Sequence, residues 1–178
     1  HMWTSITVGF IFAFPFILWE IWKFISPALY DKEKKYAASF IIVSSLLFFI
    51  GVLFGYYLIA PLSVQFFASY IVSPEINNSI DIDSYISLMK TSAIASGLLF
   101  ELPIIIFFLT KIGLVNPEFL RKYRKYTLVI VLILSAVITP PDVISQIIVA
   151  IPIMILYEAS IWISVLVIKS QEKEKLKA

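Results

Sequence analysis

Four ionisable side chains lie within or at the ends of long apolar stretches: Glu20, Lys90, Glu101 and Glu158. A charged side chain at the centre of a bilayer costs about 2.5–3.5 kcal/mol, so such groups usually face a bundle interior or a wet cavity. Glu101 stands two residues before Pro103, which has no amide proton and leaves a carbonyl one turn earlier without its helical partner. The sequence therefore predicts a polar notch at Glu101. A functional role for this carboxyl is favoured over a hydrogen bond that only joins two helices.

The remaining ionisable groups differ in the partners that the sequence offers them. Lys90 precedes Glu101 by eleven residues, so both lie on one helix face, about 16 Å apart and too far to pair. Glu20 has Lys23 three residues later and is expected to pair with it at the membrane interface. Glu158 is expected to bond to the preceding apolar segment or to nearby backbone, which is a structural role.

Several kinds of chemistry are excluded by composition. The chain has no cysteine, and His1 is its only histidine, which removes disulfides, thiolate sites and most zinc sites. It contains no glycine-rich phosphate loop, so nucleotide hydrolysis is not expected. We therefore predict no catalytic residue, no metal site and no cofactor.

Apolar blocks dominate the chain and predict its architecture. Hydrophobic residues make up 60% of the 178 residues, against about 45–50% in soluble domains. The blocks are uninterrupted rather than alternating, which predicts an all-α, polytopic membrane helical bundle forming a single domain over 1–178. The motif Gly51-x-x-x-Gly55 in the second block predicts close packing against another helix. Five spans are expected, the last two of them short, at about 3–22, 37–59 (with a possible continuation past Pro61), 85–110, 127–138 and 144–167.

Basic residues are distributed very unevenly among the connections. Thirteen of the 14 Lys and Arg residues lie in the first connection, the third connection and the tail, whereas the other two connections carry only acids. The positive-inside rule then predicts cytoplasmic loops at about 23–36 and 111–126, external loops at about 61–84 and 139–143, and a cytoplasmic tail at 169–178. With five spans this orientation starts the chain outside, so we expect an upstream helix to be missing.

Five short motifs carry a resemblance to a known family. They occur in order between about Trp3 and Ser164, and together they resemble the TatC family, the receptor subunit of the twin-arginine protein translocase, without its N-terminal segment and first helix. The motifs are Phe24-x-x-Pro27-x-Leu29-x-x-x-Glu33-Lys34-Lys35, Phe100-Glu101-x-Pro103, Arg121-Lys122-x-Arg124-x-Tyr126, Thr139-Pro140-Pro141-Asp142-x-x-Ser145-Gln146 and Leu156-Tyr157-Glu158.

The resemblance implies a receptor for signal peptides that bear two adjacent arginines. Its first cytoplasmic loop would form part of the peptide site. Glu33 would accept an arginine, Phe24 would shape the surface beside it, and Lys34 and Lys35 would complete the loop. From the residues alone, an equally good interpretation is that the lysines of this loop contact lipid phosphates. The absent N-terminal segment of the family carries a further acid of the peptide site.

The resemblance also implies a membrane site and partners. The chain would supply the last five helices of a glove-shaped, six-helix protein in the bacterial inner membrane. Glu101 would lie inside the concave face, and Thr139 and Gln146 would line the region where single-span subunits of the TatA and TatB type dock. The whole would belong to a larger oligomeric complex, driven by the proton-motive force, with no role for nucleic acid.

Three alternatives remain open at this point. A proton-coupled secondary transporter could use Glu101, although such proteins usually show repeated halves and none is visible here. An intramembrane enzyme would need a second acid near Glu101, a nucleophile with its base, or a metal site. A structural membrane scaffold needs none of these features.

Overall fold

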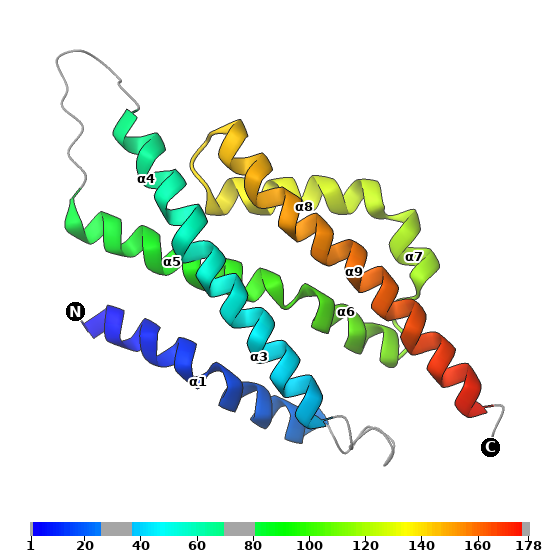
Figure 1. The fold of residues 1–178 in the computed structure, drawn as a ribbon. Helices are drawn as coiled ribbons and strands as arrows, with labels where there is room; N and C mark the ends of the chain where they lie inside the picture. Colours follow the sequence, from blue (N-terminus) through cyan, green and yellow to red (C-terminus); the bar gives the residue numbers. More distant parts are fainter. Residues whose placement is uncertain (1, 26–36, 70–80, 176–178) are drawn as a thin grey trace.

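The described part of the chain is helical throughout its regular structure. A computed structural model describes residues 2–25, 37–69 and 81–175, and no strand occurs among them (Figure 1). The predicted all-α class is therefore confirmed. The elements are α1 (Met2–Ile25), α3 (Ala37–Phe54), a π-helical turn η2 (Gly55–Ile59), α4 (Ala60–Ser69), α5 (Ile82–Phe100), α6 (Leu102–Lys111), α7 (Pro117–Lys122), α8 (Arg124–Ile138) and α9 (Val143–Lys175).

Helix α8 is shorter than the stretches that could cross a membrane. Four stretches among the described residues are long and apolar enough to cross a membrane: Met2–Phe24, Phe40–Ser69, Ile82–Lys111 and Val143–Glu172. Helix α8 has only 15 residues, or about 22 Å, against a hydrocarbon core of about 30 Å. The predicted shortness of the fourth span thus holds for its helix, and the count of five spans stays a prediction.

The predicted shortness of the last span is wrong. Helix α9 has 33 residues and is about 50 Å long, because Pro152 lies inside it without ending it. Beyond Val167 the sequence Ile-Lys-Ser-Gln-Glu-Lys-Glu-Lys consists mostly of good helix formers, so the helix continues into the predicted tail.

The second span continues past Pro61, a continuation that the sequence left open. The amide of Ala60 donates to the carbonyl of Gly55, five residues earlier, so the helix widens directly before Pro61. Such π-helical turns accommodate a residue that does not make the ordinary hydrogen bond to the carbonyl four residues earlier. Helix α4 then runs to Ser69, and the start of the predicted external loop at 61–84 is helical.

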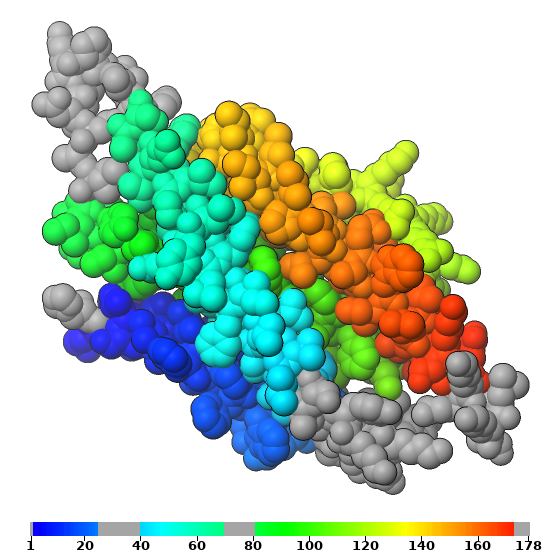
Figure 2. Space-filling model, in the orientation of Figure 1, coloured from blue at the N-terminus to red at the C-terminus, as the bar shows by residue number. Residues whose placement is uncertain are grey.

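Helices α3 and α5 pack closely, as the two glycines predict. A β-carbon at Gly51 would lie 2.7 Å from the carbonyl oxygen of Ser96, and one at Gly55 would lie 2.3 Å from that of Ser92. The hydroxyl of Ser96 donates to the Gly51 carbonyl at 2.7 Å across the same contact. Figure 2 shows α3 on the near face between α1 and α9.

Three apolar clusters hold the bundle together. The first joins α1 to α3, where the rings of Phe14 and Phe48 stack with centroids 3.6 Å apart. The second joins η2 to α8 and α9, and the third joins α6, α7 and α9. Their buried members are Phe14, Leu18, Trp22, Ile41 and Phe48 in the first, Ile59, Val131, Val149, Ala150 and Ile153 in the second, and Ile106, Leu120, Tyr157 and Ile161 in the third.

Candidate functional site

The predicted interruption at Glu101 is present. Helix α5 ends at Phe100 and α6 begins at Leu102, and Glu101 forms the joint between them. Its amide donates to the Leu98 carbonyl at 3.2 Å, a tighter turn than the α-helix makes. Pro103, in the first turn of α6, has no amide to continue the ladder. The break therefore sets a carboxyl at a kink inside the apolar stretch Ile82–Lys111.

The carboxyl of Glu101 is buried, and only one of its two oxygens accepts a hydrogen bond from a described residue. Its side chain is 7% exposed, and the hydroxyl of Ser44 on α3 donates to Oε2. The other oxygen, Oε1, is buried and has no hydrogen-bond partner among the described residues. A buried acceptor without a partner costs about 1–3 kcal/mol, so Oε1 is suited to accept a further hydrogen bond.

Ser44 is the site residue that sequence reasoning missed. It lies on α3, 57 positions from Glu101, so spacing within one helix could not connect the two. One signal was available, because Ser44, Gly51 and Gly55 recur at intervals of seven and four residues on one helical face. That face is the one that packs against α5, which carries Glu101 at its end.

Lys90 does not join this site. It is half-buried on α5, and no hydrogen bond or ion pair connects it to Glu101 in the described structure, as its distance along the helix predicts. The described residues also contain no cluster of three or more His, Cys, Asp or Glu side chains that could hold a metal.

Thr139 and Gln146 lie on either side of the turn that joins α8 to α9. The Thr139 hydroxyl donates to the Ser135 carbonyl at 2.8 Å and is buried. The Gln146 amide donates to the Leu132 carbonyl at 2.9 Å and so ties α9 to α8. The structure thus brings these two predicted residues to the same end of the α8–α9 pair.

The predicted peptide-site residues are mostly beyond the described structure. Phe24 is 87% exposed at the end of α1. Glu33, Lys34 and Lys35 lie outside the described residues. Their assignment stays a prediction.

The predicted pair of Glu20 and Lys23 is confirmed, and Glu158 proves to pair with Arg124 of the preceding helix. Lys23 Nζ lies 2.8 Å from Glu20 Oε1 on the exposed face of α1. Arg124 Nη2 lies 2.6 Å from Glu158 Oε2, which joins α8 to α9. Both pairs are largely exposed, and they position side chains more than they stabilise the fold.

Asp142 caps α9 and gives the turn a testable pH dependence. Its Oδ2 accepts from the Ser145 amide and hydroxyl, each at 2.9 Å, and these bonds lower the pKa of Asp142 below its usual value of 3.8. The cap is therefore intact above that usual value and is lost as pH falls through the lower folded pKa.

We expect hydrogen exchange in the first turn of α9 to accelerate in acid, as the cap of Asp142 is lost. Asp142→Ala should remove this protection at every pH, whereas Asp142→Asn, which caps without titrating, should keep it in acid.

These features define a multi-pass helical membrane protein with a buried carboxyl at a helix break. Residues 1–152 match the family model described as TatC, Sec-independent protein translocase protein. The chain belongs to the TatC family, which confirms the resemblance carried by the five motifs. This is a family of protein translocase components, a transport and receptor family rather than one of catalytic enzymes.

Individual relatives agree with this assignment. The chain is 46% identical to a Sec-independent protein translocase protein TatC of Blattabacterium sp. subsp. Periplaneta americana (strain BPLAN), over 96% of the chain and 64% of the relative. It is 43% identical to TatCy of Bacillus subtilis (strain 168), over 88% of the chain and 62% of the relative. It therefore spans somewhat less than two thirds of the length of these two relatives.

A solved structure shares the fold. A crystal structure described as Twin Arginine Translocase Receptor TatC in DDM superposes with a TM-score of 0.74 and 40% sequence identity. The match covers 90% of this chain and 71% of that one.

Proposed function

We propose that this chain is part of a receptor that binds twin-arginine signal peptides in a protein translocase. The observation that carries the proposal is the match to a twin-arginine translocase receptor over 90% of the chain at 40% identity. The absence of catalytic, metal and nucleotide motifs from the sequence is consistent with transport driven by the proton-motive force rather than by hydrolysis.

The proposed peptide site is the first cytoplasmic loop. Glu33 accepts a guanidinium of the signal peptide, and a carboxylate holds arginine with two parallel hydrogen bonds that lysine cannot form. Phe24 supplies an exposed apolar surface nearby, which the 87% exposure of its side chain supports. Lys34 and Lys35 directly follow Glu33 and complete the loop.

The proposed membrane site is the carboxyl of Glu101. Its unpartnered Oε1 suits a hydrogen-bond donor on a transmembrane segment of a signal peptide or partner subunit. Thr139 and Gln146 mark the region where single-span subunits of the TatA and TatB type dock. The protein lies in the inner membrane as part of a larger complex, and the distribution of basic residues supports a cytoplasmic C-terminus.

Binding of a twin-arginine signal peptide to the protein in nanodiscs tests the peptide site. We expect a twin-lysine peptide to bind about tenfold more weakly, since a charge-assisted hydrogen bond contributes about 1.5–3 kcal/mol. Glu33→Ala should weaken binding of the twin-arginine peptide by a similar factor.

The matched control is Glu172→Ala, which removes an exposed acid near the end of α9. It should leave the affinity unchanged. If the original protein and Glu33→Ala each bound the two peptides with equal affinity, this loop would not recognise the arginine pair.

A further inference from the structure

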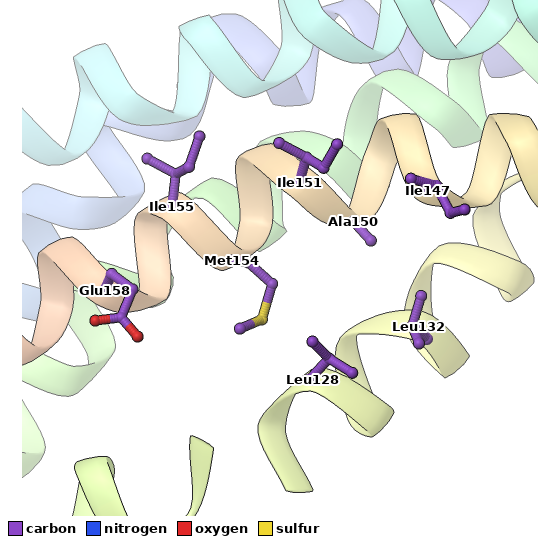
Figure 3. Close-up of a pocket in the computed structure, with 8 residues that line it drawn as sticks. All are labelled: Leu128, Leu132, Ile147, Ala150, Ile151, Met154, Ile155 and Glu158. Carbon is purple, nitrogen blue, oxygen red and sulfur yellow. The ribbon is translucent and has the colours of Figure 1, made fainter. Parts of the chain in front are cut away.

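Helices α8 and α9 enclose an apolar groove that the proposed function does not use. Its volume is about 550 Å³, and Figure 3 shows Ala150 and Met154 of α9 turned towards Leu128 and Leu132 of α8, with Glu158 at one end. Seven of its eight lining residues are apolar. They are Leu128, Leu132, Ile147, Ala150, Ile151, Met154 and Ile155, together with Glu158.

The length of the groove corresponds to one leaflet of a bilayer. From Ile147 to Glu158 the lining covers eleven residue steps of α9, or about 16 Å, which is half of a hydrocarbon core of about 30 Å. The ion pair of Arg124 and Glu158 closes one end, and the bond from Gln146 to the Leu132 carbonyl closes the other. A groove closed at both ends over this length suits an acyl chain better than a membrane-crossing helix.

Positive charge gathers at the end that the ion pair closes. Arg121, Lys122, Arg124 and Lys125 are all exposed there, at the end of α7 and the start of α8. Arg124 contacts Glu158 through Nη2, and a guanidinium has five N–H donors in all, so it can hold a phosphate as well. Basic pockets between membrane helices are suited to anionic lipid head groups.

We propose that this groove binds one anionic phospholipid. Its phosphate lies against Arg124 and the neighbouring basic side chains, and one acyl chain follows the apolar lining towards Ile147. The carboxylate of Glu158 holds the guanidinium in place and at the same time repels the phosphate, which limits the affinity. This site goes beyond the proposed receptor function and does not depend on it.

Native mass spectrometry of the intact protein tests the proposal, with phosphatidylglycerol and phosphatidylcholine of identical acyl chains as probes. We expect phosphatidylglycerol to bind about tenfold more tightly, because both lipids carry the phosphate but only phosphatidylcholine adds a choline cation that the basic side chains repel. Arg124→Gln should remove most of this preference. The matched control is Lys23→Gln, which removes one positive charge on α1, remote from the groove, and should leave the preference intact.

Two further variants separate a lipid site from a structural ion pair. Glu158→Gln breaks the same pair as Arg124→Gln but should strengthen phosphatidylglycerol binding, because the repulsion of the phosphate is removed. Met154→Trp should fill the groove and weaken binding of both lipids, whereas Leu166→Trp on an exposed face of α9 outside the groove should not.

Several results would overturn the lipid site. One is equal binding of the two lipids. Another is a shift of the same sign in Arg124→Gln and Glu158→Gln, which would point to a purely structural pair. If Met154→Trp left lipid binding unchanged but abolished association with a single-span subunit, the groove would instead be a helix-docking site.

Discussion

Gly55→Ala is expected to lower the free energy of unfolding by about 3 kcal/mol, the upper end of the usual cost of overpacking. The added methyl group would lie 2.3 Å from the Ser92 carbonyl, and backbone cannot move aside as the end of a flexible side chain does. The second span and α5 would have to move apart at this contact. Thermal unfolding in detergent, followed by intrinsic tryptophan fluorescence, measures the loss.

Gly9→Ala is the matched control for this substitution. A β-carbon at Gly9 meets no atom within 4 Å, so the same change in α1 removes a flexible residue without a clash. It should leave stability unchanged or raise it by up to about 1 kcal/mol. If both variants unfolded at the same temperature as the original protein, close packing at Gly55 would not limit stability.

Glu101→Leu is expected to abolish export of a folded reporter that carries a twin-arginine signal peptide, while the protein itself stays folded. Leucine removes both carboxyl oxygens, including the unpartnered Oε1 proposed to receive a partner's donor. Replacing a buried charged group by an apolar one of similar size is often neutral or stabilising. The Ser44 hydroxyl can then turn to a carbonyl of its own helix. Export in cells and thermal stability of the purified variant are measured side by side.

Glu172→Leu makes the same change at an exposed position of α9 and should export normally. Loss of export together with loss of folding in Glu101→Leu would make the carboxyl a structural group. Normal export by that variant would remove Glu101 from the mechanism altogether.

The features that sequence predicted well depend on local rules. The break at Glu101 follows from a proline two residues later, and the pair of Glu20 and Lys23 follows from helical spacing. The close approach of α3 and α5 follows from two small residues one turn apart. Each of these needs only residues within a few positions of one another, so one chain segment contains the whole signal.

The features that sequence did not predict depend on contacts between distant segments. Ser44 reaches Glu101 only because α3 and α5 cross where they do, and no local pattern fixes that crossing. For Glu158 the sequence left two kinds of partner open, the preceding helix and nearby backbone, and its pairing with Arg124 depends on the register of α8 against α9. The length of α9 was underestimated because hydropathy marks where the membrane ends and does not mark where a helix ends.

The π-helical turn at Gly55–Ile59 changes the direction in which the residues after it face around the axis of the second span. The buried residues of α3, η2 and α4 include Phe48, Gly55, Ile59 and Ser63, and the last three are four positions apart. In an ideal α-helix, steps of four residues drift around the axis by about 40° each, and a sustained repeat longer than 3.6 residues requires a right-handed supercoil. The wider turn absorbs this drift at one place. The buried positions before and after Pro61 can therefore stay on one face of the second span.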